Sequence, residues 1–161
     1  MNNGLEIERK FLIRYPDISK FSDARKADIE QTYLEGGGRI RKWCEDGNVT
    51  YILTQKEKLT ELTRIERESE LFEDEYNALL LKRNPETATL RKTRYSFPYG
   101  GKILEVDIFP FWTDRAFLEI ELESEDEGFS IPDYIEIIKE VSVDRRYLNF
   151  ALAKEVITEE I

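Results

Sequence analysis

Polar and hydrophobic residues alternate along several segments of the chain, which is the pattern of β-strands that bury one face. The first segment is a clear case, because Glu6, Glu8 and Lys10 alternate with apolar residues over positions 5–13. Similar runs recur between short breaks that contain Gly, Pro or Asn. The pattern predicts eight strands, over residues 5–13, 29–34, 39–44, 49–56, 63–71, 89–97, 102–109 and 116–122.

Two of the breaks, Asp46-Gly47 and Gly100-Gly101, have the composition of tight hairpin turns. Apolar spacing of three and four residues predicts helices over 73–83, 132–141 and 147–156, with a weaker helical signal over 17–26. No repeat, low-complexity segment or long linker divides the sequence. We therefore predict a single domain over residues 1–161, of the α+β class and dominated by antiparallel strands.

Composition excludes several kinds of chemistry. Among the 161 residues, 34 Asp and Glu outnumber 24 Lys and Arg, which gives a formal net charge of −10, and histidine is absent. A Ser-His-Asp triad, a Cys-His dyad and a histidine-ligated zinc site are therefore excluded, and the single cysteine, Cys44, excludes an intrachain disulfide. The acidic balance argues against nucleic-acid binding, and no apolar run is long enough for a membrane span. We expect a soluble cytoplasmic protein with neither partner.

The polar face of the predicted strands consists almost entirely of charged side chains. For any one strand, a solvated face with cross-strand ion pairs is the simpler explanation, but seven strands repeat the pattern. Solvated faces also usually contain Thr, Ser and Gln. The face carries eight acids, Glu6, Glu8, Glu66, Glu68, Glu105, Asp107, Glu119 and Glu121, and seven bases, Lys10, Arg39, Arg41, Lys56, Arg64, Lys92 and Arg94.

Eight strands are enough to close a barrel. Because the predicted helices need apolar surfaces to pack on, we expect the apolar face outside and the charged face inside, as the lining of a lumen. Buried charges without partners are costly, so such a lumen must hold water, ions and ligand. Lys and Arg bind phosphate oxygens, and clustered carboxylates bind hard divalent cations such as Mg²⁺ or Mn²⁺. A phosphate compound bound together with a divalent metal ion is the ligand that suits both the basic and the acidic residues.

The same residues resemble a known family. The segment Glu6-Ile7-Glu8-Arg9-Lys10 resembles the E-x-E-x-K opening signature of the CYTH superfamily, the triphosphate tunnel metalloenzymes. The resemblance covers residues 4–154, with blocks in the family's order. The later blocks are Gln31-Thr32-Tyr33-Leu34, Arg39-Ile40-Arg41, Thr54-Gln55-Lys56, Arg64-Ile65-Glu66-Arg67-Glu68, Lys92-Thr93-Arg94-Tyr95, Leu104-Glu105-Val106-Asp107, Glu119-Ile120-Glu121 and Asp144-Arg145-Arg146-Tyr147-Leu148-Asn149.

The resemblance implies an eight-stranded antiparallel tunnel that binds a triphosphate with Mg²⁺ or Mn²⁺, with two ions expected. It implies metal ligation by Glu6, Glu8, Asp107, Glu119 and Glu121. For Glu66, Glu68 and Glu105, three roles stay open: metal ligand, holder of metal-bound water, or partner that orients arginines. The implied phosphate-binding residues are Lys10, Arg39, Arg41, Lys56, Lys92 and Arg94, together with Arg64. A structural ion pair across the lumen is the alternative role for each of these residues.

The compact chain is most similar to bacterial inorganic triphosphatases, which hydrolyse tripolyphosphate to pyrophosphate and phosphate. The resemblance names Lys92 as the candidate general base, with Lys10 and Glu8 as further catalytic residues. We expect Tyr147 to belong to a C-terminal helix that plugs or covers one mouth of the tunnel, where it either binds substrate or packs. Trp43 and Trp112 are more typical of packing than of stacking on a substrate ring.

Two alternatives to the triphosphatase remain open. Class IV adenylyl cyclases and thiamine triphosphatases share the same tunnel, although the sequence shows no clear adenine pocket. A non-catalytic polyphosphate or nucleotide-binding module is the alternative of another class. Eight carboxylates disfavour that module, because an anion binder gains nothing from repelling carboxylates without metal. The oligomeric state, monomer or homodimer, is also open.

Overall fold

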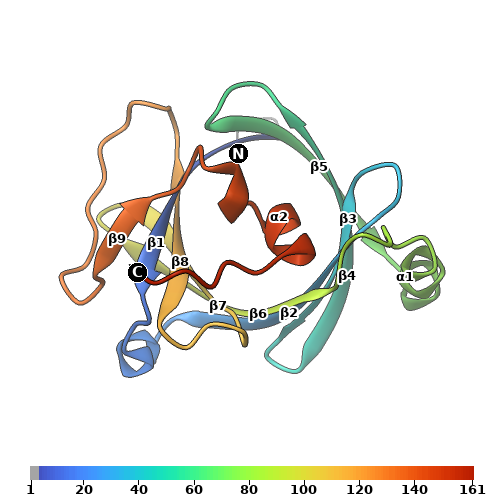
Figure 1. Ribbon diagram of the computed structural model, residues 1–161, viewed down its shortest axis with the longest axis horizontal. Coiled ribbons are helices and arrows are strands. Elements are labelled where there is room, and N and C mark those ends of the chain that lie inside the picture. Colours follow the sequence, from blue (N-terminus) through green and yellow to red (C-terminus); the bar gives the residue numbers. More distant parts are fainter. Residues whose placement is uncertain (1–3) are drawn as a thin grey trace.

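The computed structural model describes residues 4–161, and eight of its strands close into an antiparallel barrel (Figure 1). The strands follow the order β5-β4-β3-β2-β6-β7-β8-β1, and residues 5–7 of β1 pair with residues 63–65 of β5 to close the circle. The predicted eight-stranded barrel is confirmed. Its strands are β1 (Leu5–Arg14), β2 (Arg25–Tyr33), β3 (Arg39–Glu45), β4 (Asn48–Lys58), β5 (Thr63–Leu71), β6 (Leu90–Tyr99), β7 (Lys102–Ile108) and β8 (Arg115–Leu122).

Both predicted hairpin turns are present. Asp46 and Gly47 have φ values of 52° and 78° and connect β3 to β4, while Gly100 and Gly101 have φ values of 58° and 78° and connect β6 to β7. Two successive residues with positive φ match the right-handed twist of the flanking strands, which is why Asp-Gly and Gly-Gly favour this connection. These turns fix the register, and the register decides which side chains face the lumen.

A ninth strand lies outside the barrel. We predicted a helix over 132–141, but this is wrong, because β9 (Ile137–Glu140) pairs antiparallel with β1. The pairing of β1 with β5 covers only residues 5–7. The later half of β1 therefore leaves an open edge, and β9 pairs with that edge at residues 11–13. Pairing across the sheet overrides the local helical spacing of this segment.

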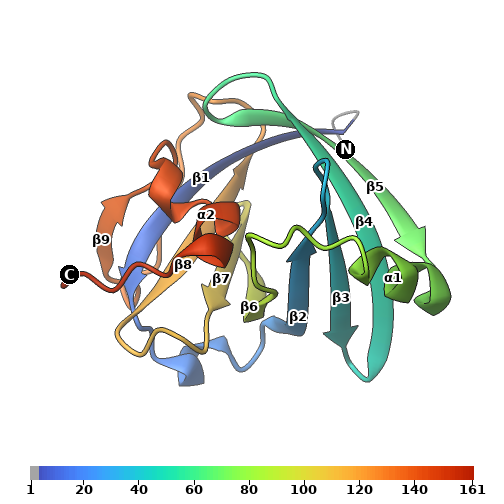
Figure 2. The same ribbon diagram turned by 45° about the vertical axis from the view of Figure 1, so that its right-hand side comes forward.

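Helices are short in this fold. The helix α1 (Glu73–Leu80) packs on the outside of the barrel beside β3 to β5 (Figure 2). The predicted C-terminal helix is divided into η2 (Arg145–Tyr147) and α2 (Asn149–Lys154). The helical signal over 17–26 is wrong, because only the 3₁₀ turn η1 (Ile18–Phe21) forms and β2 already begins at residue 25. Over residues 4–161, every helix is too short or too polar to span a bilayer.

The outer face of β1, β7 and β8 carries the main apolar core. Fully buried side chains there, such as Ile13, Leu104 and Leu118, pack against η1 and the segment before β9. Burial of one such side chain stabilises the fold by roughly 1.5–3 kcal/mol. The apolar exterior that we predicted is therefore present on these strands, and its burial offsets the cost of charges in the lumen.

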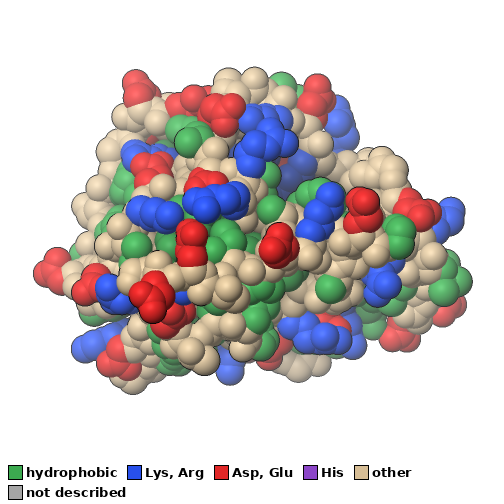
Figure 3. All heavy atoms as spheres, viewed as in Figure 1, with side chains coloured by type: hydrophobic (Ala, Val, Ile, Leu, Met, Phe, Trp, Pro, Cys, Tyr) green, Lys and Arg blue, Asp and Glu red, His purple; other side chains and the backbone are tan. Residues whose placement is uncertain are grey.

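One end of the lumen is apolar, which the alternation did not predict. Leu12, Leu90 and Phe117 point inward from their strands and pack against Tyr147 and Leu152 of the C-terminal segment. The helix α2 lies inside the outline of the barrel (Figure 1), and atoms fill the barrel when it is viewed from this side (Figure 3). The C-terminal segment thus plugs one mouth, as expected, and limits the charged lining to the rest of the lumen.

Candidate active site

The lumen contains a cavity of about 730 Å³ whose lining is mostly charged. Strand geometry explains the lining, since side chains two positions apart on a strand share a face. Most of the residues that we predicted for the site line this cavity. They are Glu6, Glu8, Lys10, Arg39, Arg41, Lys56, Arg64, Glu66, Glu68, Arg94, Glu105, Glu119, Glu121 and Tyr147.

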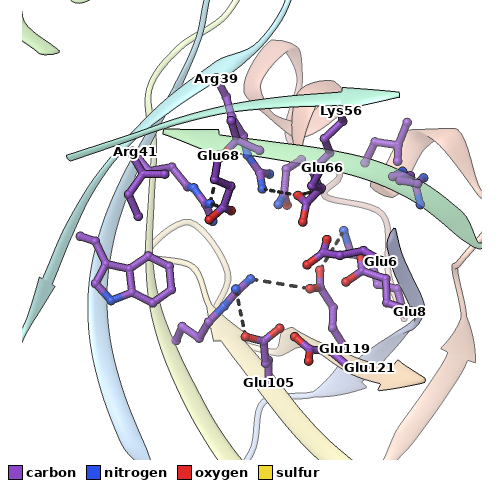
Figure 4. Close-up of a pocket in the computed structure, with 18 of the residues that line it drawn as sticks. Glu6, Glu8, Arg39, Arg41, Lys56, Glu66, Glu68, Glu105, Glu119 and Glu121 are labelled. Carbon is purple, nitrogen blue, oxygen red and sulfur yellow. Dashed lines mark hydrogen bonds and ion pairs between the residues drawn. The ribbon is translucent and has the colours of Figure 1, made fainter. Parts of the chain in front are cut away.

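The cations of β3, β4 and β5 form one side of the cavity, which we name the basic wall: Arg39, Arg41 and Lys56, which Figure 4 labels, and Arg64. Glutamates from β5 hold three of them. Glu66 accepts from Lys56 at 3.0 Å and lies 3.5 Å from Arg39, while Glu68 accepts from Arg41 at 2.9 Å.

These ion pairs leave some hydrogen-bond donors of the basic wall without partners. The Nε–H groups of Arg39 and Arg41 are buried and have no hydrogen-bond partner within residues 4–161. Burial and the neighbouring Arg39 cation lower the pKa of Arg41 to about 10. A bound anion would satisfy these donors and relieve this repulsion.

The opposite side of the cavity, which we name the acidic wall, consists of five glutamates from β1, β7 and β8: Glu6, Glu8, Glu105, Glu119 and Glu121 (Figure 4). Strand pairing brings them together, because Glu8 is opposite Glu121 and Glu105 is opposite Glu119. Like charges in register repel each other. Among the described residues, Glu6, Glu8 and Glu121 take part in no salt bridge.

The acidic wall holds more carboxylates than its cations can neutralise, and their pKa values show it. Burial and the contact with Glu66 raise the pKa of Glu6 to about 9. Burial, which outweighs the effect of Arg94, raises the pKa of Glu105 to about 8. Burial also raises the pKa values of Glu8 and Glu121. An additional cation would lower all four pKa values, because it favours the ionised carboxylates.

Glu66 differs from these acids although it contacts one of them. Burial raises its pKa, but the hydrogen bond with Glu6 and the cations of Lys56 and Arg39 outweigh burial and bring the value to about 2. It is therefore an ionised partner of the basic wall.

Two cations pair with the acidic wall. Arg94 on β6 donates to Glu105 at 3.1 Å and lies 3.6 Å from Glu119. The Lys10 ammonium lies 3.9 Å from Glu119 and donates to the backbone carbonyl of Tyr147 at 2.7 Å. Lys10 therefore lies where the charged cavity meets the plug, and the hydrogen bond ties the C-terminal segment to the acidic wall.

Two predicted site residues, Lys92 and Asp107, lie behind the cavity lining. They pair with each other at 3.0 Å, and their side chains are 2% and 1% exposed. Both oxygens of Asp107 also accept from Arg94, at 2.8 and 2.9 Å. Although burial raises the pKa of Asp107, Arg94 and Lys92 hold it well below its usual range. This placement supports a role in anchoring Arg94. Burial, which outweighs the effect of Asp107, lowers the pKa of Lys92 to about 8, which favours a general base, although its ammonium lies behind the lining. Metal ligation by Asp107 stays a prediction.

A divalent cation fits the chemistry of the acidic wall. The donors are all carboxylate oxygens, which Mg²⁺ and Mn²⁺ prefer, and burial together with neighbouring carboxylates raises the pKa values of four of the five. Across residues 4–161, no three acidic or cysteine side chains come close enough to form a ready cation cage. Glu105 and Glu119 instead pair with Arg94, and Glu119 also lies near Lys10.

The cavity also contains residues that we had not assigned to the site. Trp43 follows Arg41 by two positions on β3, and Tyr33 ends β2; both line the cavity. Asn149 of α2 does so as well, and its Oδ1 has no hydrogen-bond partner in the described chain. The period of two along β3 would have identified Trp43, had tryptophan not been taken as a packing residue.

Two comparisons with known proteins agree with this geometry. The family model of the CYTH domain matches residues 4–148. Among solved structures, the inorganic triphosphatase NE1496 is 28% identical, with a TM-score of 0.60 over 92% of this chain and 94% of that chain. The PH1819 protein from Pyrococcus horikoshii OT3 is 25% identical, with a TM-score of 0.57 over 75% of this chain and 80% of that chain. A search of curated proteins finds no significant match.

Proposed function

The chain belongs to the CYTH domain family, and on that premise we propose that it hydrolyses inorganic tripolyphosphate to pyrophosphate and phosphate with a divalent metal ion. The observation that carries the proposal is the pairing of the basic wall and the acidic wall across one cavity. A polyphosphate and a divalent cation together satisfy both walls, whereas either one alone leaves the other wall uncompensated. The similarity to the inorganic triphosphatase NE1496 supports the same reaction class.

The basic wall would bind the phosphate chain. Arg39 and Arg41 present buried N–H donors without partners, and guanidinium groups bind phosphate oxygens in pairs of hydrogen bonds. Lys56 supplies a further positive charge, while Glu66 and Glu68 hold these cations in place. We assign Glu66 and Glu68 this orienting role, because their carboxylates are already paired with the wall.

The acidic wall would hold the metal ion through Glu6, Glu8, Glu119 and Glu121. When bound, the ion supplies positive charge that neutralises phosphate oxygens. Arg94 and Lys10 lie between the walls and stabilise the negative charge that develops on the leaving pyrophosphate. Lys92 and Asp107 keep Arg94 in this position through buried ion pairs.

The attacking water must lose a proton, and histidine is absent. We assign the proton to the carboxylate of Glu105, which lines the cavity and accepts a hydrogen bond from Arg94. A cation bound to the neighbouring carboxylates would favour its ionised form, which can accept a proton. The water oxygen bonds to the terminal phosphorus as the bond from that phosphorus to the bridging oxygen breaks, and pyrophosphate carries the electron pair away.

A substrate panel tests the proposal. The protein is incubated with tripolyphosphate, thiamine triphosphate or ATP, with Mg²⁺, Mn²⁺ or a chelator, and phosphate, pyrophosphate and cyclic AMP are measured. We expect equal amounts of phosphate and pyrophosphate from tripolyphosphate, only with metal. Cyclic AMP with pyrophosphate from ATP would instead identify a cyclase. Tight binding of tripolyphosphate without metal-dependent hydrolysis would contradict the proposal and identify a binding module.

A further inference from the structure

The tryptophan of the cavity, Trp43, has no part in the mechanism above. It lies on β3, two positions after Arg41, and therefore points into the same lumen. Its indole ring belongs to none of the three apolar clusters of the described residues. Its contacts point to another role.

Two neighbours fix the orientation of the ring. The indole Nε1–H donates to Oε1 of Glu45 at 3.0 Å. The same carboxylate accepts two hydrogen bonds from Arg25 of the adjacent β2, at 2.9 and 3.1 Å. These hydrogen bonds from Arg25 and Trp43 lower the pKa of Glu45, so the carboxylate stays ionised at neutral pH. The chain Arg25–Glu45–Trp43 thus restrains a ring that would otherwise rotate.

The restrained ring faces two of the phosphate-binding cations. The guanidinium carbon of Arg41 lies 5.6 Å from the ring centroid and that of Arg94 lies 6.0 Å away. Both distances are within the range of cation–π attraction, in which the electron-rich face of the ring stabilises a positive charge. The two cations repel each other, and Arg94 contributes to the lowered pKa of Arg41. A neutral ring that attracts both allows them to share the cavity.

We propose that Trp43 is a positioning residue, which holds the guanidinium groups of Arg41 and Arg94 where they meet the phosphate oxygens. The proposal rests on the proposed function, since it takes tripolyphosphate as the anion that these two arginines bind. Arg41 extends from the basic wall, whereas Arg94 is anchored to the acidic wall through Asp107 and Glu105. By holding Arg41 and Arg94, Trp43 therefore fixes the positions of the two walls relative to each other at one end of the cavity.

Calorimetric titration with tripolyphosphate in chelator tests the proposal without turnover. We expect Trp43→Leu, which removes the aromatic face, to raise Kd about tenfold. Trp43→Phe keeps the face and loses only the Nε1–H donor, so Kd should stay within about threefold of wild type. Glu45→Gln, which weakens the restraint from Arg25, should have an effect between these two. The conservative variant thus rescues what the aliphatic variant loses.

A spectroscopic readout separates positioning from a general structural role. The chain has two tryptophans, so tripolyphosphate should change the tryptophan emission of wild type but not that of Trp43→Phe. A merely structural role would lower the number of binding sites per chain at unchanged Kd. The matched control is Phe129→Leu, which removes a ring that covers the Arg9 guanidinium at 4.8 Å outside the lumen. This control should leave Kd unchanged.

The outcomes separate the two proposals. If Trp43→Leu binds tripolyphosphate as tightly as wild type, or weakens binding no more than Phe129→Leu, the positioning role is overturned whether or not wild type turns over. If wild type binds and the variants differ as expected but no hydrolysis occurs, the positioning role stands and the triphosphatase proposal fails. If wild type does not bind tripolyphosphate in chelator, the positioning role is overturned, and the substrate panel with metal decides the triphosphatase proposal separately.

Discussion

The basic wall and the acidic wall are built on the same sheet, yet they are unbalanced in opposite ways. The cations of the basic wall pair with Glu66 and Glu68 of β5. Two buried guanidinium N–H groups, those of Arg39 and Arg41, have no hydrogen-bond partner among the described residues. The acidic wall has only Arg94 and Lys10 for five carboxylates, and burial together with neighbouring carboxylates raises the pKa values of Glu6 and Glu105. The difference indicates that one wall is prepared for an anion and the other for a cation.

The largest effect should follow from weakening the acidic wall. Glu121→Gln keeps the shape of the side chain and removes a charge that we assign to metal binding, so we expect turnover of tripolyphosphate to fall about a hundredfold to a thousandfold. Binding of tripolyphosphate in chelator should not weaken. Phosphate release and calorimetry measure the two quantities. The matched control is Glu136→Gln, an exposed glutamate paired with Arg14 outside the lumen; if this variant loses as much, the assignment to the acidic wall is wrong.

A smaller effect should follow from opening the basic wall. Arg41→Ala removes a cation that is 5% exposed and leaves Glu68 without its partner. We expect KM for tripolyphosphate to rise about ten- to a hundredfold, because charge-assisted hydrogen bonds to phosphate are lost. Arg41→Lys should recover only part, since an ammonium lacks the planar donor pair. An unchanged KM in steady-state kinetics would remove Arg41 from the phosphate site.

Glu66 tests which carboxylates bind metal and which orient the cations of the basic wall. Its carboxylate pairs with Lys56 and Arg39, so Glu66→Gln should disturb orientation and lower kcat/KM less than about tenfold. The Mg²⁺ concentration for half-maximal rate should be unchanged. A metal titration of the rate measures this. If the variant requires much more Mg²⁺, as Glu121→Gln should, then Glu66 is a metal ligand and belongs functionally to the acidic wall.

The acidic wall should also make stability depend on pH in a particular direction. The ordinary carboxyl pKa of 4.5 is raised to about 9 for Glu6 and about 8 for Glu105, so between these values the folded chain binds more protons than the unfolded chain. Stability is then present at low pH and is lost as pH rises through this window. Above about pH 8 the lowered pKa of Lys92 acts in the opposite direction.

We therefore expect Tm in chelator to fall by about 5 °C between pH 5 and pH 8, as measured by scanning calorimetry. Added Mg²⁺ should raise Tm at pH 8, because an ion that binds only the folded chain stabilises it. The double variant Glu6→Gln with Glu105→Gln should flatten the pH dependence. A Tm that rises steadily from pH 5 to pH 8 would show that these carboxyls do not carry raised pKa values.

Alternation along the strands predicted which face each charged residue would share, and this was enough for the barrel and for most of the charged residues that line the cavity. Glu6, Glu8 and Arg41 lie in the lumen because the period of two is a property of any strand. Alternation does not predict depth along the lumen, which depends on where the C-terminal segment inserts. Lys92 shares its face with Arg94 yet lies behind the lining. The strand β9 was predicted as a helix because its local spacing does not reveal its partner, which is an open edge of β1.

The most direct test of the two walls is a crystal structure with tripolyphosphate and Mn²⁺, in which the anomalous signal locates the metal. We expect phosphate oxygens on Arg39, Arg41 and Lys56, and manganese on the glutamates of the acidic wall, within the same cavity. Manganese bound outside the lumen, or phosphate bound to the outer surface of the barrel with an empty cavity, would contradict it.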